Sequence, residues 1–278
     1  MTKKLFWRGF AVLGLIVIAC AIAFIVHLVK PRNFDATGSE IVLHLKGGDF
    51  KCPWFPPSKK STAKGIVVLG TGDGGWSYWE DNTAQALAAN GYAVIGWDCR
   101  DFADSRFYDH SDLVDGFHSA ADSAQSQLGT PGLPLWYGGW STGAEQSVAA
   151  AGSPDRPKPL MGLLLAAPGE RGRYGISTSD LLGVTPTGDD TFALADFASQ
   201  LDGLHVAQFA AGLDPMDHTD WLTELRTPHK IFELPGCLHD MGGAGEEFQA
   251  KLREAIRWSR SEKDATSVKD SRLERVRE

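Results

Sequence analysis

A serine stands in the middle of a glycine-rich pentapeptide, Gly139-Trp140-Ser141-Thr142-Gly143, which has the form G-x-S-x-G. An apolar stretch at 133–138 precedes it, and an alanine-rich stretch at 144–151 follows it. A strand, a tight turn and a helix in this order form a nucleophile elbow, in which the hydroxyl stands above the edge of a sheet. The pentapeptide alone is a weak signal, because an ordinary glycine–serine turn has the same composition. Its flanks favour catalysis, so we predict that Ser141 is a nucleophile.

A serine hydroxyl needs a base to take its proton, and in this kind of arrangement the base is a histidine late in the chain. Four histidines follow Ser141, namely His205, His218, His229 and His239. His205 opens a predicted strand and His229 precedes one, which suits structural or exposed positions. His239 lies in a glycine-rich segment, 235–243, between the last predicted strand and the last predicted helix. We therefore predict that His239 is the base.

An acid should end the strand before the histidine loop, because it holds the imidazole in one tautomer. The predicted strand at 206–211 runs into Gly212-Leu213-Asp214-Pro215-Met216-Asp217. Asp214 is nearest the strand end, and Pro215 would fix the turn that aims it. Asp217 is the second candidate, and the alternative role for either carboxylate is to cap a turn.

Two backbone N–H groups should stabilise the oxyanion of the reaction. One is that of Thr142, which follows the nucleophile. The other would come from the loop Gly70-Thr71-Gly72-Asp73-Gly74-Gly75-Trp76, whose glycines let the backbone approach a substrate oxygen. Asp73 or Gly74 is the predicted donor. A phosphate-binding role is disfavoured, because the loop lacks the Lys-Ser/Thr pair of a P-loop.

Short apolar runs alternate with amphipathic stretches from about residue 41 to residue 258. Strands are expected at 41–45, 66–69, 92–97, 133–137, 160–167, 206–211 and 230–234, and helices at 82–90, 111–128, 142–151 and 246–258. Such a pattern indicates an α/β fold, with a mostly parallel sheet covered by helices on both faces. Residues 168–203 break the pattern and read as an insertion over the carboxyl edge of the sheet. Residues 30–40 read as a linker, and 259–278 as a charged tail that is a frayed helix or disordered.

These motifs together resemble the VirJ/AcvB-type bacterial virulence proteins, over about residues 63–258. The resemblance rests most on Gly72–Trp76, Gly96–Asp98, Ser141 and His239. It implies an α/β-hydrolase fold, export to the periplasm, and hydrolysis of aminoacylated phosphatidylglycerol, with ties to virulence and type IV secretion. The chain departs from the family pattern at Trp140, Thr142 and 99–101, which bears on the identity of the substrate. A general carboxylesterase or lipase, and a non-catalytic assembly factor for a secretion system, are the alternatives.

Tryptophans and carboxylates near the motifs suggest a substrate site. Trp76 and Trp140 could line an acyl or headgroup pocket, since an indole offers a large apolar face with one polar edge. An aminoacyl ester carries an ammonium group, so its site needs a carboxylate. Asp98 and Asp73 are the candidates, although Asp98, which follows a predicted strand, could equally cap the next turn. We predict a lipid or small ester as the substrate, and neither a metal nor an organic cofactor is implied.

The segment at 10–29 is apolar except for His27 and is long enough to span a bilayer. It predicts an uncleaved anchor in the cytoplasmic membrane, with 1–9 in the cytoplasm. Basic residues before it (Lys3, Lys4, Arg8) outnumber those after it (Lys30, Arg32), which favours a periplasmic domain. The alternatives are a signal peptide cleaved near Ala21–Ala23 and a lipoprotein modified at Cys20.

The net charge of −8 hides an asymmetry, because no acidic residue precedes Asp35. The remainder holds 22 basic and 35 acidic residues, which argues against nucleic-acid binding and predicts a preference for cationic over anionic lipid headgroups. Cys52, Cys99 and Cys237 could supply one disulfide, or all could be free thiols. No cysteine–histidine spacing typical of zinc occurs. Protein partners cannot be named from the sequence.

Overall fold

The structure is a computed structural model that describes residues 13–23, 26, 30, 34–59 and 62–275, with side chains described up to residue 261. Its centre is an eight-stranded sheet in the order β1-β2-β4-β3-β5-β6-β9-β10. The six strands from β4 to β10 are parallel, whereas β1 and β2 form an antiparallel edge. The strands are β1 (Ser39–Leu45), β2 (Gly48–Phe55), β3 (Gly65–Gly70), β4 (Tyr92–Trp97), β5 (Leu135–Trp140), β6 (Leu160–Ala166), β9 (His205–Ala211) and β10 (His229–Leu234).

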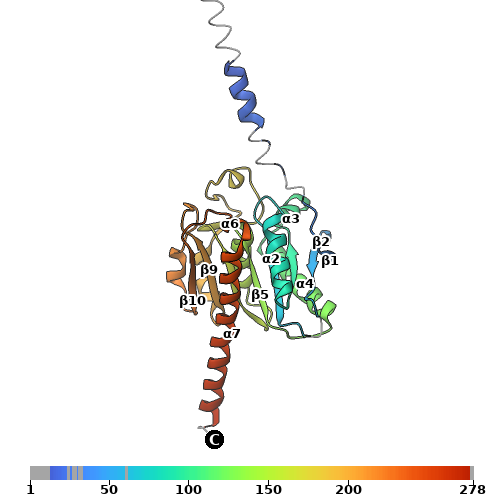
Figure 1. Ribbon diagram of the computed structural model, residues 1–278, viewed down its shortest axis with the longest axis vertical. Coiled ribbons are helices and arrows are strands. Elements are labelled where there is room, and N and C mark those ends of the chain that lie inside the picture. Colours follow the sequence, from blue (N-terminus) through green and yellow to red (C-terminus); the bar gives the residue numbers. More distant parts are fainter. Residues whose placement is uncertain (1–12, 24–25, 27–29, 31–33, 60–61, 276–278) are drawn as a thin grey trace, which may run out of the picture.

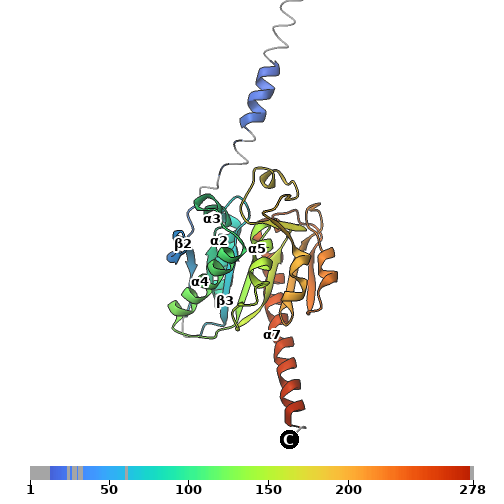
Figure 2. The same cartoon turned by 180° about the vertical axis from the view of Figure 1, so that it is seen from behind.

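Helices cover both faces of the sheet (Figures 1 and 2). The helices α2 (Tyr78–Ala89) and α7 (Glu246–Arg275) pack on one face, and α3 (Cys99–Ser105), α4 (His110–Leu128) and α5 (Thr142–Ala151) pack on the other. Each face therefore has its own apolar core, and strands β3, β4 and β5 are buried throughout because they lie between the two cores. The predicted mostly parallel α/β sheet is confirmed.

Most predicted elements are present, with a few differences. Helix α2 begins four residues earlier than expected, because Ser77 caps it by accepting a hydrogen bond from the N–H of Trp79. Strand β2 and helix α3 were not predicted; β2 contains Pro53, and α3 is a short helix that Asp98 caps. Helix α7 continues to Arg275, so the described part of the charged tail is helical.

The expected linker at 30–40 is shorter in the structure. Phe34 and Ala36 already pack against the core of the α2–α7 face, and the N–H of Thr37 donates to Asp81 at 2.9 Å. Strand β1 then begins at Ser39. The folded domain thus starts at about residue 34, because these apolar side chains already pack on that core.

The N-terminal predictions fall largely outside the described residues. Residues 1–12 and 27–29 lie outside them, while 13–23 are helical with exposed side chains. Within the part of the chain that is described, no helix is both long and apolar enough to cross a membrane.

The insertion after β6 has secondary structure of its own. A two-stranded antiparallel ribbon pairs β7 (Arg171–Arg173) with β8 (Thr191–Ala193). The 3₁₀ turn η2 (Asp180–Leu182) lies between the two strands of this ribbon, and the 3₁₀ helix η3 (Leu194–Leu201) follows β8. Because β6 ends at the carboxyl edge of the sheet, the insertion begins above the same edge to which β5 delivers Ser141.

Candidate active site

Ser141 occupies a strained turn between β5 and α5. Its backbone has φ 53° and ψ −120°, and residues other than glycine rarely adopt such a positive φ. The turn is fixed by hydrogen bonds on both sides, because its N–H donates to the carbonyl of Ala166 and its carbonyl accepts from Ala144 and Glu145. This is the backbone geometry of a nucleophile elbow, as the pentapeptide predicted.

The two glycines of the pentapeptide are required by the approach of β3. A Cβ atom on Gly139 would lie 2.4 Å from the carbonyl oxygen of Gly70, and one on Gly143 would lie 2.3 Å from the same oxygen. Real Cβ atoms do not come so close to backbone. The strand, turn and helix can therefore close around Ser141 only because both positions lack a side chain.

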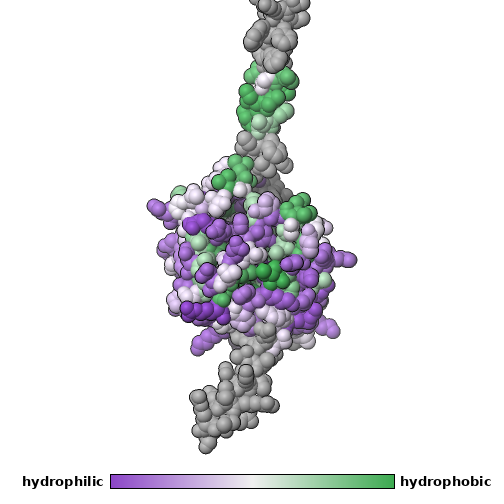
Figure 3. Space-filling model, turned by 90° about the vertical axis from the view of Figure 1, so that its left-hand side faces the viewer, coloured by the Kyte–Doolittle hydropathy of each residue, from purple (hydrophilic) through white to green (hydrophobic). Residues whose placement is uncertain are grey.

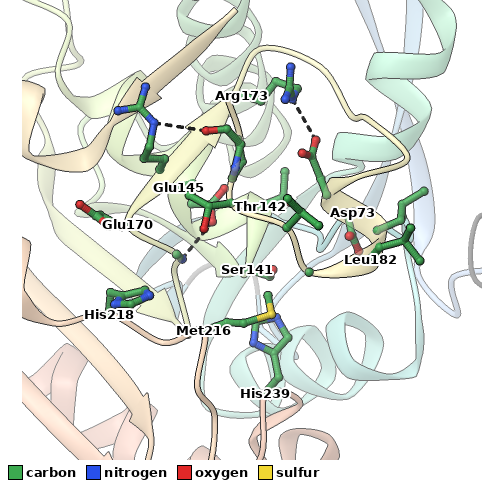
Figure 4. A pocket seen from close by; sticks show the side chains of 18 of the residues that line it. Asp73, Ser141, Thr142, Glu145, Glu170, Arg173, Leu182, Met216, His218 and His239 are labelled. Carbon is green, nitrogen blue, oxygen red and sulfur yellow. Dashed lines mark hydrogen bonds and ion pairs between the residues drawn. The ribbon is translucent and has the colours of Figure 1, made fainter. Parts of the chain in front are cut away.

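His239 and Asp214 form a hydrogen-bonded pair. The imidazole Nδ1 lies 2.6 Å from Oδ2 of Asp214, whose side chain is only 3 % exposed. The other carboxylate oxygen accepts from the N–H of Met216 at 3.0 Å, which fixes the orientation of the carboxylate. The loops after β9 and β10 are joined by the hydrogen bond from the Leu213 N–H to the Cys237 carbonyl, at 3.0 Å. Ser141 and His239 line the same cavity (Figure 4).

Asp217, the second candidate for the acid, has other partners. It accepts hydrogen bonds from Nε2 of Gln208 at 2.9 Å and from the N–H of Ala211 at 2.6 Å. Burial raises the pKa of Asp217 to about 6, although these two hydrogen bonds lower it. Asp217 therefore ties the loop to strand β9, and the structure pairs Asp214 with the imidazole.

Trp140 supports the histidine loop as well as lining the cavity. Its Nε1 donates to the main-chain carbonyl of His239 at 2.8 Å, and the two rings are 5.5 Å apart. On its other side the indole stacks on Trp79, with ring centroids 5.5 Å apart. Only 7 % of Trp140 is exposed. Its contacts are thus mainly with the protein, whereas the sequence predicted a substrate contact.

The predicted oxyanion donors border the cavity. Thr142 lines it at the start of α5, and Asp73 lines it from the loop after β3. Four other amides of this loop donate into the protein: Thr71 to the carbonyl of Trp97, Gly72 to Glu80, Gly75 to the carbonyl of Gly72, and Trp76 to Asp98. Asp73 and Gly74 stay the predicted source of the second donor.

Trp76 and Asp98 lie outside the lining of this cavity. Asp98 caps α3, because one carboxylate oxygen accepts from the N–H groups of Arg100 and Asp101 and the other accepts from Trp76. Trp76 is 4 % exposed and stacks on Phe55. Both border a separate hollow beside Phe34. The structure gives Asp98 the capping role that the sequence left open, and it places Asp98 and Trp76 at that hollow and not in the lining of the cavity of Ser141.

The cavity around Ser141 has a volume of about 610 Å³ and is roofed by the insertion. Two arginines hold the roof together. Arg173 pairs with Asp180 at 2.9 Å and with Asp190 at 2.6 Å, and Arg171 donates to the hydroxyl of Thr191 at 2.9 Å. Only 12 % of the Arg173 side chain is exposed. Its charge is therefore balanced within the roof itself.

Glu145 is a cavity residue that the sequence analysis missed. It lies on α5 one turn after Ser141, and its Oε1 accepts from the N–H of Gly169 at 2.9 Å. Burial raises the pKa of Glu145 to about 8. The spacing of four residues could have revealed it, because positions i and i+4 share one face of a helix.

The cysteines are all free thiols. Cys52 and Cys99 are buried, and burial raises the pKa of both thiols. The open question of a disulfide among the three later cysteines is thus answered in favour of free thiols. Across the described ranges, no group of three or more His, Cys, Asp or Glu side chains is placed to hold a metal ion.

Comparison with known proteins agrees with this geometry. A family profile described as "Serine aminopeptidase, S33" matches residues 61–184, which include the loop after β3 and the elbow. The chain is similar in structure to DcsB, solved with a substrate analogue (TM-score 0.62, 13 % identity, covering 80 % of this chain and 98 % of that one). It is also similar to Est1E from Butyrivibrio proteoclasticus (TM-score 0.60, 11 % identity, covering 81 % of this chain and 100 % of that one). A third similar structure is XC6422 from Xanthomonas campestris, described as an α/β serine hydrolase without lid (TM-score 0.53, 18 % identity, covering 81 % of this chain and 97 % of that one).

The chain has the α/β-hydrolase fold. The family match and the structural neighbours support a serine ester hydrolase. No curated protein matches the sequence significantly.

Proposed function

We propose that this α/β-hydrolase cleaves carboxylic esters by two-step acyl transfer, with Ser141 as nucleophile, His239 as general acid and base, and Asp214 as the acid of the triad. The observation that carries the proposal is the 2.6 Å hydrogen bond between His239 Nδ1 and Asp214 Oδ2, beside the cavity that Ser141 also lines. This hydrogen bond leaves the imidazole Nε2 as the nitrogen that can take the serine proton.

The reaction begins when His239 accepts the hydroxyl proton of Ser141 and the oxygen attacks the ester carbonyl. The N–H of Thr142 and a second N–H, from Asp73 or Gly74, stabilise the oxyanion. The imidazolium then protonates the leaving alcohol, which gives an acyl-enzyme. Water, activated by the same imidazole, attacks the acyl group, and the acid is released with Ser141 regenerated.

The proposed substrate is an ester with a positively charged acyl group, such as the aminoacyl ester of phosphatidylglycerol. Carboxylates of Asp73, Glu145 and Glu170 border the cavity of Ser141, and an ammonium group binds best to a carboxylate. The roof arginines, Arg171 and Arg173, already have partners. Recognition of the ammonium is thereby reassigned from Asp98 to these cavity carboxylates.

The proposed location is the outer face of the cytoplasmic membrane, with the segment at 10–29 as the anchor and the domain in the periplasm. The basic residues that flank this segment support this orientation. Cleavage or lipidation of the segment would give a periplasmic protein with the same domain. Mass measurement of the mature chain from membranes would distinguish these three forms.

A fluorophosphonate probe tests the catalytic role directly, because it reacts with an activated serine. Wild-type protein should be labelled and should hydrolyse p-nitrophenyl acetate. Ser141→Ala should lose labelling and nearly all turnover, while Ser199→Ala, which removes an exposed serine of the insertion, should keep both. Wild-type protein that is folded but neither labelled nor active would contradict the proposal and favour a non-catalytic assembly factor.

The substrate class needs a separate test. Purified protein should release amino acid from aminoacylated phosphatidylglycerol faster than it releases fatty acid from unmodified phosphatidylglycerol. A strain that lacks the protein should accumulate the aminoacylated lipid. Equal rates on both lipids, with no accumulation, would indicate a general carboxylesterase or lipase.

A further inference from the structure

The chain enters its folded domain at the same edge of the sheet that carries the active site. Phe34 and Asp35 border a hollow together with Trp76 and Asp98, which follow the carboxyl ends of β3 and β4. Ser141, Asp214 and His239 follow the carboxyl ends of β5, β9 and β10, and these strands are all parallel. The N-terminal segment therefore leaves the domain at its active-site end, and α7 ends at the opposite one (Figures 1 and 2).

The chain between the apolar segment and the domain is short. Only five Cα–Cα steps separate Val29, the last apolar residue, from Phe34, which is packed on the domain. Fully extended chain spans at most about 3.6 Å per residue, so these steps reach no more than about 18 Å. The headgroup layer on one side of a bilayer is itself about 5–8 Å thick. If the segment at 10–29 lies in a bilayer, the active-site edge must lie close to its surface.

Exposed apolar side chains line the cavity or adjoin its site residues in the chain: Leu182, Val184 and Met216 line it, and Leu213 and Leu238 directly precede Asp214 and His239. We name as the apolar rim Leu182, Val184, Leu213, Met216 and Leu238, which are 49 %, 55 %, 58 %, 38 % and 62 % exposed. They come from the insertion, from the loop after β9 and from the loop after β10, three separate segments. Figure 3 shows apolar surface at this end of the domain.

Two contacts between segments bring residues of the apolar rim together. A Cβ on Gly183, between the two insertion residues of the rim, would lie 2.9 Å from the sulfur of Met216. The N–H of Leu213 donates a hydrogen bond to the carbonyl of Cys237, the residue before Leu238. Exposed apolar groups that gather in one patch mark a surface with a partner, whereas scattered ones do not. Leucine, valine and methionine are side chains that enter lipid at little cost.

We propose that the apolar rim contacts a phospholipid bilayer, so that the cavity of Ser141 opens toward the membrane and takes its ester from the lipid surface. The occupant is a bilayer because the proposed anchor would hold this edge against one and the rim is apolar. The acidic domain would be repelled by anionic lipid, so apolar contact must supply the attraction. Delivery of the ester rests on the proposed esterase activity, and the contact itself rests on the proposed anchor at 10–29.

A fluorescent reporter tests the contact without any enzyme activity. The full chain, with Cys20→Ser and Cys237→Ser to remove reactive thiols, receives a nitrobenzoxadiazole label at Leu213→Cys. The matched control carries the label at Thr130→Cys, an exposed residue between α4 and β5 at the amino edge of the sheet. Both proteins are reconstituted into vesicles of phosphatidylethanolamine and phosphatidylglycerol that contain a lipid with a quencher on its acyl chain.

The label at 213 should shift its emission to the blue and be quenched several-fold more than the label at 130. Equal emission and equal quenching at the two positions would overturn the proposal, and so would stronger quenching at 130. Because neither readout uses turnover, a result of either kind is independent of whether the chain is an esterase.

Kinetics test the delivery of substrate. For Leu238→Asp, the rate on an ester embedded in vesicles is divided by the rate of the same variant on water-soluble p-nitrophenyl acetate, which corrects for any effect on neighbouring His239. This ratio should fall about tenfold relative to wild type, while Thr130→Asp, which adds the same charge at the opposite edge, should keep the wild-type ratio. An unchanged ratio for Leu238→Asp would overturn delivery from the bilayer. If wild-type protein hydrolyses neither the embedded ester nor p-nitrophenyl acetate, the result contradicts the proposed function instead.

Discussion

The indole Nε1 of Trp140 donates a hydrogen bond of 2.8 Å to the main-chain carbonyl of His239, although 99 residues separate them in the sequence. One residue of the elbow turn therefore holds the loop that carries His239, the proposed base. The same indole stacks on Trp79, so the loop is supported by a buried pair of rings. The elbow and the histidine loop are thus coupled directly, through a residue next to the nucleophile.

Trp140→Phe should slow acylation, because it removes this hydrogen bond and keeps an aromatic ring. A hydrogen bond contributes about 1 kcal/mol, so we expect kcat to fall roughly 5–10-fold with little change in KM. Trp79→Phe is the matched control, since it removes a similar volume from the ring pair and leaves the bond to His239. The rate of fluorophosphonate labelling measures the effect on Ser141. Equal losses in the two variants would mean that packing, and not the hydrogen bond, supports the loop.

Asp214→Asn and Asp217→Asn should separate the two carboxylates by function. Asp214→Asn removes the acceptor that orients the imidazole, so kcat should fall about 10³–10⁴-fold with little loss of thermal stability. Asp217→Asn should mainly change the melting temperature, because Asp217 bonds to Gln208 and to the backbone of Ala211. The opposite pattern would assign the triad acid to Asp217.

Much of the fold could be predicted from the sequence, because buried parallel strands are continuous apolar runs. Strand β4 and helix α5 have the predicted bounds, since glycine or the elbow marks their ends. Strand β2 was missed because it is an antiparallel strand whose burial alternates along GDFKCPWF and which contains a proline. The insertion was recognised only as a break in the pattern, because its ribbon is held by ion pairs of Arg173 that no periodicity encodes.

The candidate site could be predicted where a motif fixes a residue at a strand end, as for Ser141, His239 and Asp214. It could not be predicted where the role depends on which way a side chain turns after the strand. Asp98 follows β4 just as Asp214 follows β9, yet the Asp98 carboxylate caps α3. Glu145 enters the cavity only because the helix after the elbow aligns it with Ser141, a placement that the motif itself does not describe.

Asp98→Asn should affect stability and leave substrate selection unchanged. The carboxylate accepts from the N–H groups of Arg100, Asp101 and Trp76, and an amide can replace only part of these contacts. Loss of a helix cap costs about 1 kcal/mol, so we expect a lower melting temperature. The ratio of kcat/KM between an aminoacyl ester and its uncharged isostere should equal that of wild type. A selective loss on the aminoacyl ester would restore Asp98 as the ammonium partner.

Glu145→Gln should reduce the preference for a positively charged acyl group. An ammonium group in the cavity would lower the raised pKa of Glu145 and ionise its carboxyl, whereas the isosteric amide cannot ionise. We expect kcat/KM on an alanyl ester to fall about tenfold and that on the isobutyryl ester, which lacks the ammonium, to change less than twofold. Glu233→Gln, which removes an exposed carboxylate of β10 outside the cavity lining, is the matched control. Equal effects of Glu145→Gln on both esters would show that Glu145 does not recognise the charge.

The pH dependence of stability offers a second, independent test of Glu145. Its pKa in the folded protein is about 8, above the ordinary value of 4.5, because burial disfavours the ionised carboxylate. Between these two values the native state holds a proton that the unfolded state releases, so the free energy of unfolding falls as pH rises from about 4.5 to about 8, and the loss is complete above 8. Glu145→Gln has no such proton. The melting temperature of this variant minus that of wild type should therefore increase as pH is raised from 5 to 9. Parallel melting curves for the two proteins across this range would mean that the carboxyl of Glu145 already ionises near its ordinary pKa in the folded state.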